Sequence, residues 1–346
     1  MKKILFILLV ILIAGFNTAG FSKGIELTGA GATFPYPLYS KMFNEYHKLT
    51  GTKVNYQAIG SGGGIRQLRA KTVDFGASDA FVNDEGLKKF ASPIVHIPMT
   101  AGAVVVAYNL PGNPQLKLTP EVLADIFLGK IKKWNDKRIA ELNKNVQLPS
   151  LPIMVAHRSD GSGTTFIFTD YLSKVSKEWK EKVGKGKSVN WPVGLGGKGN
   201  QGVAGLVKNM PGSIGYVELA YAIQNNMPYA TLKNKAGNFV KPSLESVSKA
   251  ANIDLPDDMR VSLTNTGASY GYPISGFTWI LVYQNLEDGK LSEEKAKELV
   301  NLLKWMLTEG QKYCEPLHYA PLSETAKKKA LAILKKVKYR GKALLK

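Results

Sequence analysis

Three glycine-rich segments each connect a strand-like run to a helix-like pattern, and this arrangement constrains the fold more than any other feature. They are residues 29–35, 60–64 and 160–165, with the sequences GAGATFP, GSGGG and DGSGTT. Glycine suits a tight turn from a strand into a helix because it adopts backbone conformations that a Cβ atom disfavours. Repetition of strand, turn and helix predicts an α/β fold, in which such turns meet beyond the carboxyl ends of the strands.

Apolar periodicity along the rest of the chain agrees with alternating strands and helices. Strands are expected at residues 25–28, 54–59, 73–78, 97–108, 151–157 and 278–283. Helices are expected at residues 36–49, 64–70, 120–128, 165–175, 292–308 and 323–335. The roughly 320 residues that follow residue 22 exceed what one hydrophobic core usually holds, so we expect two lobes.

The first 22 residues have the features of a secretory signal peptide. Lys2 and Lys3 precede an apolar run at residues 4–16, and small or polar residues follow at 17–20. The apolar run is shorter than the about 20 residues that a transmembrane helix needs. No cysteine lies near the expected cleavage region, so we expect no lipid anchor and a soluble periplasmic protein.

The chain is strongly basic, with a formal net charge of +19. Its lysines are spread over amphipathic segments and no nucleic-acid-binding signature accompanies them, so nucleic acid is not an expected partner. A positive field can steer small anions toward a cleft. A solvated basic surface without a specific partner is the competing interpretation.

The glycine-rich segments contain the donors that a small oxyanion requires. A helix N-terminus has N–H groups without intrahelical partners, and glycine lets an anion approach them. Hydroxyl donors are added by Thr33, Ser61, Ser162 and Thr164. An ordinary helix cap is the competing interpretation for Thr33 and for residues 160–165, and a flexible loop is the competing interpretation for residues 60–64.

Asp79 follows another strand-like run and indicates selectivity among anions. A carboxylate repels a fully deprotonated anion, but it accepts a hydrogen bond from an anion that still carries a proton, such as hydrogen phosphate. Sulfate has no proton at neutral pH, so its charge would face the carboxylate unpaired. A helix cap before residues 83–85 is the competing interpretation of Asp79.

Motifs of common enzyme classes are absent or lack the context that they require. Residues 184–188 resemble a phosphate-binding loop, but Glu181 stands where the Walker pattern needs glycine. The GxGxxG spacing at residues 194–199 follows a polar, proline-containing segment instead of an apolar strand. The histidines are far apart and there is a single cysteine, so we expect neither a metal site nor a cofactor. Two alternatives stay open: a phosphatase with Ser162 or Thr164 as nucleophile, and an anion-binding adhesin that uses the basic exterior.

Longer stretches of the chain closely resemble the periplasmic phosphate-binding proteins of high-affinity phosphate transport systems. They are residues 27–35, 54–57, 73–79, 128–134, 158–164, 191–200 and 211–218, in the expected order. The resemblance implies a type II periplasmic-binding-protein fold in which two lobes close on one phosphate by a hinge motion. It places residues 23–100 and 274–346 in lobe I and residues 101–273 in lobe II.

The resemblance also implies a set of phosphate-binding residues. These are Ala32, Thr33, Phe34, Ser61, Asp79, Arg158, Ser162, Gly163 and Thr164. Asp160 matches the partner of the ligand-contacting arginine in a salt link. The chain departs from the family where Gly62 replaces a serine and where Ser159 replaces an alanine. By resemblance, the protein is a noncatalytic monomer that delivers phosphate to an ABC importer with two membrane permease subunits and a cytoplasmic ATPase pair.

Overall fold

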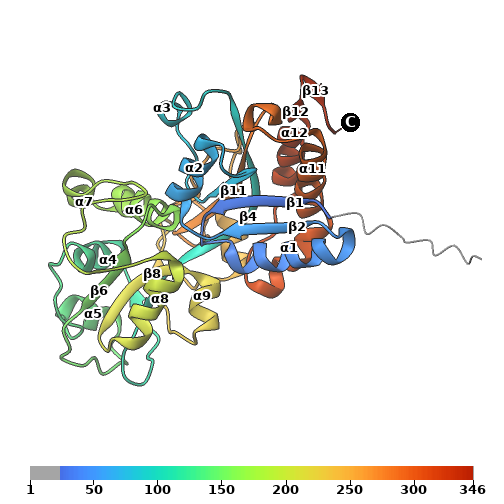
Figure 1. Cartoon of the computed structure of the whole chain (residues 1–346). Helices are drawn as coiled ribbons and strands as arrows, with labels where there is room; N and C mark the ends of the chain where they lie inside the picture. Colours follow the sequence, from blue (N-terminus) through green and yellow to red (C-terminus); the bar gives the residue numbers. More distant parts are fainter. Residues whose placement is uncertain (1–23, 346) are drawn as a thin grey trace, which may run out of the picture.

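The computed structural model describes residues 24–345 and shows two α/β lobes (Figure 1). The expected signal peptide at residues 1–22 lies outside the described residues. One mixed sheet of eight strands runs through both lobes in the order β2–β1–β3–β11–β4–β8–β6–β7. Its strands are β1 (Glu26–Gly31), β2 (Lys53–Gln57), β3 (Phe75–Ser78), β4 (Ile94–Tyr108), β6 (Met154–Arg158), β7 (Leu195–Gly197), β8 (Ser213–Glu218) and β11 (Ser275–Tyr283).

The long strand β4 belongs to both lobes. Its residues 94–103 pair antiparallel with β11, and its residues 104–108 pair antiparallel with β8. On the first side of β4, strands β1, β2 and β3 are parallel to one another, and on the second side β6 is parallel to β7 and β8. Strand β4 therefore joins the two parts of the sheet, and β11 lies between β4 and β3.

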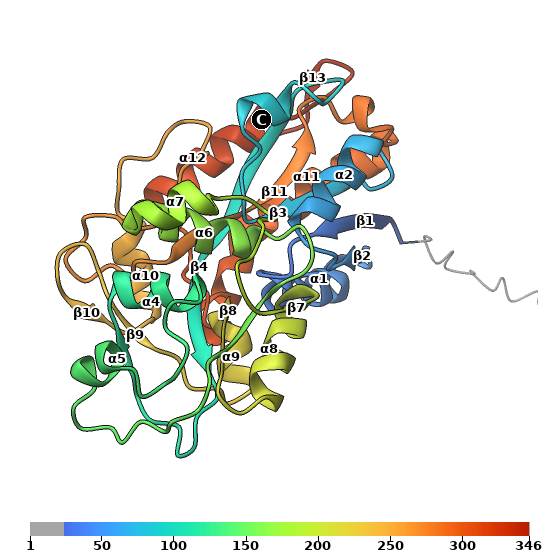
Figure 2. The ribbon, with the colours of Figure 1, turned by 90° about the vertical axis from the view of Figure 1, so that its left-hand side faces the viewer.

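Helices surround each part of the sheet, as Figures 1 and 2 show from two directions. The first lobe has α1 (Tyr36–Thr50), α2 (Ser61–Ala70), α3 (Asp84–Leu87), α11 (Glu293–Leu307) and α12 (Glu324–Lys335). The second has α4 (Pro120–Phe127), α5 (Lys137–Leu142), α6 (Gly163–Val175), α7 (Lys177–Lys182), α8 (Gly199–Asn209), α9 (Leu219–Gln224) and α10 (Leu244–Ala250). Two small sheets contain β5 (Lys117–Leu118), β9 (Thr231–Lys233) and β10 (Phe239–Val240), and β12 (Lys338–Tyr339) and β13 (Lys342–Ala343). Within residues 24–345, no helix is long and apolar enough to cross a membrane.

Every strand and helix predicted from the sequence is present, with ends that differ by a few residues. The most informative difference is at α2, which begins at Ser61 and not at Gly64. Its first turn contains the glycine run because the helix packs tightly against neighbouring backbone. A Cβ atom at Gly64 would lie 2.4 Å from the carbonyl oxygen of Ala30. The flexible-loop interpretation of residues 60–64 is therefore wrong.

Candidate ligand-binding site between the lobes

The glycine-rich segments of the two lobes meet at the boundary between the lobes. From the first lobe come residues 32–34 after β1, Ser61 at the start of α2, and Asp79 after β3. From the second lobe come Arg158 at the end of β6 and residues 162–164 at the start of α6. The polar side chains of this set are at most 4% exposed. The turns that follow the strands thus converge at one buried place, as the α/β pattern predicts.

Direct contacts across this boundary show that the lobes are closed on each other. The backbone N–H of Gly163 donates to Ser61 Oγ at 3.0 Å, and the N–H of Gly62 donates to the carbonyl oxygen of Gly161 at 2.8 Å. A Cβ atom at Gly163 would lie 2.5 Å from Ser61 Oγ and 2.6 Å from Asp79 Oδ2. Glycine at position 163 is therefore required for this approach of the two lobes.

Three tyrosine hydroxyls hold the loop that follows β1. They donate to consecutive carbonyl oxygens: Tyr56 to Ala32 at 2.7 Å, Tyr221 to Thr33 at 2.5 Å and Tyr319 to Phe34 at 2.7 Å. The C=O and N–H of one trans peptide unit point in opposite directions. The held carbonyls of Ala32 and Thr33 therefore turn the N–H groups of Thr33 and Phe34 the other way, where neither meets a protein acceptor among residues 24–345.

Ser61 and Ser162 both use their oxygen atoms as acceptors within the protein. Ser61 Oγ accepts from the N–H of Gly163 and, at 3.2 Å, from the N–H of Asp79. Ser162 Oγ accepts from the N–H of Thr165 at 3.0 Å and caps α6, so the cap interpretation is correct for this residue. A hydroxyl that accepts in this way still has its hydrogen to donate. Capping and ligand binding are therefore compatible at Ser162.

The cap interpretation is wrong for Thr33 and for Asp79. Helix α1 begins after Pro35 without a side-chain cap, and the N-cap of α3 is Asn83, whose side chain accepts from the N–H of Gly86. Thr33 and Asp79 are buried instead at the boundary between the lobes.

Arg158 and Asp160 form the predicted ion pair with two parallel hydrogen bonds. Arg158 Nε donates to Asp160 Oδ1 at 2.7 Å, and Nη2 donates to Oδ2 at 2.6 Å. The N–H of Gly199 adds a third donor to Asp160 at 3.0 Å. Burial by itself raises the pKa of Asp160, but the hydrogen bonds and charge of Arg158 and the N–H of Gly199 act against it, and the pKa lies below its ordinary value. The arginine charge is thus balanced by the protein.

Asp79 is an acceptor in a site otherwise made of donors. Thr278 Oγ1 donates to Asp79 Oδ1 at 2.8 Å, and Oδ2 faces Gly163 at the start of α6. Burial raises the pKa of Asp79 to about 7, and the hydrogen bond from Thr278 and the charge of Arg158 offset only part of this effect. The carboxyl group therefore exchanges its proton near neutral pH.

Sequence reasoning assigned no role to Asn200 or Thr278, although both touch the predicted residues. Asn200 Nδ2 donates to Thr33 Oγ1 at 2.8 Å and to Thr164 Oγ1 at 3.0 Å. The available signals were weak: Asn200 follows a glycine-rich stretch, and Thr278 interrupts an apolar run. Within residues 24–345, no cluster of His, Cys, Asp and Glu side chains could hold a metal ion.

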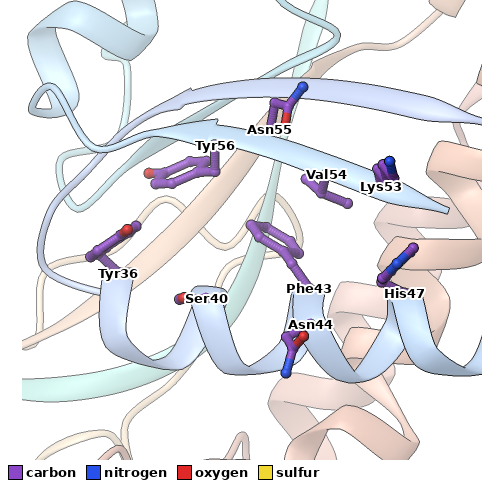
Figure 3. Close-up of a pocket in the computed structure, with 9 residues that line it drawn as sticks. All are labelled: Tyr36, Ser40, Phe43, Asn44, His47, Lys53, Val54, Asn55 and Tyr56. Atoms are coloured by element: carbon purple, nitrogen blue, oxygen red, sulfur yellow. The ribbon is translucent and has the colours of Figure 1, made fainter.

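A groove of about 330 Å³ beside the edge strand β2 is separate from this site (Figure 3). Side chains of α1 and β2 line it, among them Phe43, His47 and Lys53, and none of the predicted ligand residues does. Tyr56 connects the two places because it lines the groove while its hydroxyl donates to Ala32.

Comparisons with known proteins agree with this architecture. The family model described as a PBP superfamily domain matches residues 17–309. The phosphate-binding protein PstS of Pasteurella multocida is 51% identical over 303 residues, which cover 86% of each chain. The chain belongs to the PstS family of the PBP superfamily. The PstS protein of Xylella fastidiosa is 48% identical over 308 residues, covering 87% of this chain and 82% of the relative. The crystal structure of a phosphate-binding protein from Stenotrophomonas maltophilia shares the fold, with a TM-score of 0.69 at 18% identity over 89% of this chain and 94% of that one.

Proposed function

We propose that this PstS family member is a noncatalytic extracytoplasmic receptor that binds inorganic phosphate and delivers it to an ABC phosphate importer. Its relatives at about half identity are named phosphate-binding proteins. The observation that carries the proposal is a buried set of hydroxyl and N–H donors around one carboxyl group, Asp79. Such a set matches a tetrahedral anion that has oxygens to accept hydrogen bonds and one proton to share.

The proposed phosphate-binding residues are those named from the sequence. They are Ala32, Thr33, Phe34, Ser61, Asp79, Arg158, Ser162, Gly163 and Thr164, with Asp160 holding the arginine. In this arrangement the hydroxyls and the main-chain N–H groups of Thr33 and Phe34 donate to phosphate oxygens, and the Asp79 carboxyl shares the proton of the ligand. Sulfate lacks that proton, so it leaves an ionised Asp79 facing another negative charge.

We place the hinge at the two passages of the chain between the lobes. Lobe I comprises residues 23–100 and 274–346, and lobe II comprises residues 101–273. The first boundary falls within β4, which pairs with strands of both lobes, and the second falls just before β11. Two closely spaced crossings suit a rotation of one lobe against the other.

The transport assignment extends to the location and the partners of the protein. A cleaved signal peptide at residues 1–22 would release the receptor into the periplasm without a lipid anchor. There, as a monomer, it would pass phosphate to two membrane permease subunits driven by a cytoplasmic ATPase pair. The names of the relatives support phosphate binding directly. They support the link to a transport system only through membership of the PstS family.

Calorimetric titration of protein freed of bound phosphate tests the proposal. We expect one phosphate per chain and much weaker binding of sulfate at alkaline pH. Thr164→Val should weaken phosphate binding roughly 10- to 100-fold, because a hydrogen bond to a charged group is lost. Thr72→Val, at an exposed position of the first lobe, should bind like the wild type. Failure to bind phosphate, or equal affinity for both anions above neutral pH, would refute the assignment.

A further inference from the structure

Asn200 connects the two walls of the candidate site. It is the second residue of α8 and is completely buried. Its Nδ2 donates to Thr33 Oγ1 in the first lobe and to Thr164 Oγ1 in the second, and its backbone N–H donates to Thr33 Oγ1 at 3.1 Å. One amide group therefore contacts two of the hydroxyls that the proposed function assigns to phosphate.

The orientation of this amide is determined by its surroundings. Asn200 Oδ1 accepts from the backbone N–H of Glu218 at 2.9 Å. The opposite orientation would bring the amide nitrogen against this N–H donor and would leave both threonine oxygens facing Oδ1. The N–H of Glu218 therefore directs the two hydrogens of Asn200 Nδ2 toward the threonines.

The hydrogen bonds that the threonines accept determine where their own hydrogens go. A hydroxyl has one hydrogen and two lone pairs. Thr33 Oγ1 accepts both bonds from Asn200, and Thr164 Oγ1 accepts from Asn200 Nδ2 and, at 3.4 Å, from Arg158 Nη1. With both lone pairs engaged, each hydroxyl can act only as a donor.

We propose that Asn200 is a positioning residue that forces the Thr33 and Thr164 hydroxyls to donate to the bound anion. The inference rests on the proposed function, because the acceptor for these hydrogens is phosphate. It also links recognition to closure. Thr33 and Asn200 lie on different lobes, so the Thr33 hydroxyl is restricted to donation only when the lobes meet.

Phosphate titrations of Asn200 variants test the inference. Asn200→Ala should weaken phosphate binding roughly 10- to 100-fold, since two donor groups lose their orientation. Asn200→Asp, which keeps the shape but presents an acceptor, should weaken it further. Asn209→Ala, at an exposed position at the other end of α8, should bind like the wild type. Wild-type affinity in either Asn200 variant would overturn the inference.

A double-mutant cycle with Thr33→Val separates positioning from general structural support. If Asn200 acts through the Thr33 hydroxyl, Asn200→Ala should cost several-fold less affinity in the Thr33→Val background, since interacting positions are not additive. If the double variant loses phosphate affinity by the product of the two single-variant losses, the inference is contradicted. Should Asn200→Ala fail to fold, as thermal unfolding without phosphate would show, Asn200→Asp takes its place in the cycle. A wild-type protein that binds no phosphate would refute the proposed function itself.

Discussion

The carboxyl group of Asp79 should make sulfate binding depend on pH. Thr278 occupies Oδ1, so Oδ2 is the oxygen that faces the second lobe. Burial places the pKa of Asp79 at about 7. Above this pH, Asp79 is a carboxylate and cannot donate a hydrogen bond to sulfate, which has no proton of its own. Below this pH, Asp79 is a carboxylic acid and donates a hydrogen bond to sulfate. Phosphate brings its own proton and does not depend on Asp79 in this way.

The size of the change in sulfate affinity follows from the free energy that is needed to protonate Asp79. One pKa unit corresponds to about 1.4 kcal/mol, or about tenfold in affinity. Sulfate binding to the wild type should therefore strengthen about 50-fold as the pH falls from about 9 to about 7, and level off below pH 7 at about 100 times its strength at pH 9. In Asp79→Asn the amide donates at every pH, so sulfate affinity should be independent of pH and discrimination against sulfate should be lost.

Calorimetric titration with sulfate and with phosphate across this pH range measures the effect. Asp254→Asn, which removes an exposed carboxylate of the second lobe, is the matched control and should keep the wild-type profile. A wild-type sulfate affinity that does not change with pH would contradict the role of Asp79 in selectivity. An Asp79→Asn variant that still rejects sulfate as strongly as the wild type does would contradict it equally.

Three further changes test other contacts. Gly163→Ala places a methyl group 2.5 Å from a side chain across the boundary and should weaken phosphate binding roughly 10- to 100-fold by calorimetry, whereas Gly205→Ala, with open space around it, should not. Asp160→Ala leaves the buried Arg158 guanidinium unpaired and should lower the free energy of unfolding by about 3 kcal/mol in denaturant titrations without phosphate. The folded-state pKa of Asp79 is raised from 3.8 to about 7, so the ligand-free protein binds this proton more tightly than the unfolded chain does. Its stability should fall as the pH rises from about 4 to about 7, by at most about 4 kcal/mol, and this part of the pH dependence should be missing in Asp79→Asn. If the stability of Asp79→Asn depends on pH in the same way as that of the wild type, the raised pKa assigned to Asp79 is contradicted.

Local patterns in the sequence predict most of the fold and most of the candidate site. Apolar periodicity locates each expected element because the side chains that it buries are close in the chain. Glycine next to hydroxyl residues marks the strand-to-helix turns, and the α/β architecture brings such turns together. The sequence pattern predicts too late a start for α2 because three glycines are unusual in a helix. The structure explains them by the close approach of this helix to β1.

What the sequence by itself determined is the chemistry of the site: a set of neutral donors, an arginine with its carboxylate partner, and one acceptor at Asp79. Only the tertiary structure decided how these groups are oriented and charged. Asn200 reaches Thr33 across 167 positions of the chain, and Thr278 reaches Asp79 across 199. The pKa of Asp79 likewise depends on its burial in the packed structure. Hydrogen-bond direction and desolvation arise from neighbours in space, and contacts between distant segments exist only after the two lobes have packed together.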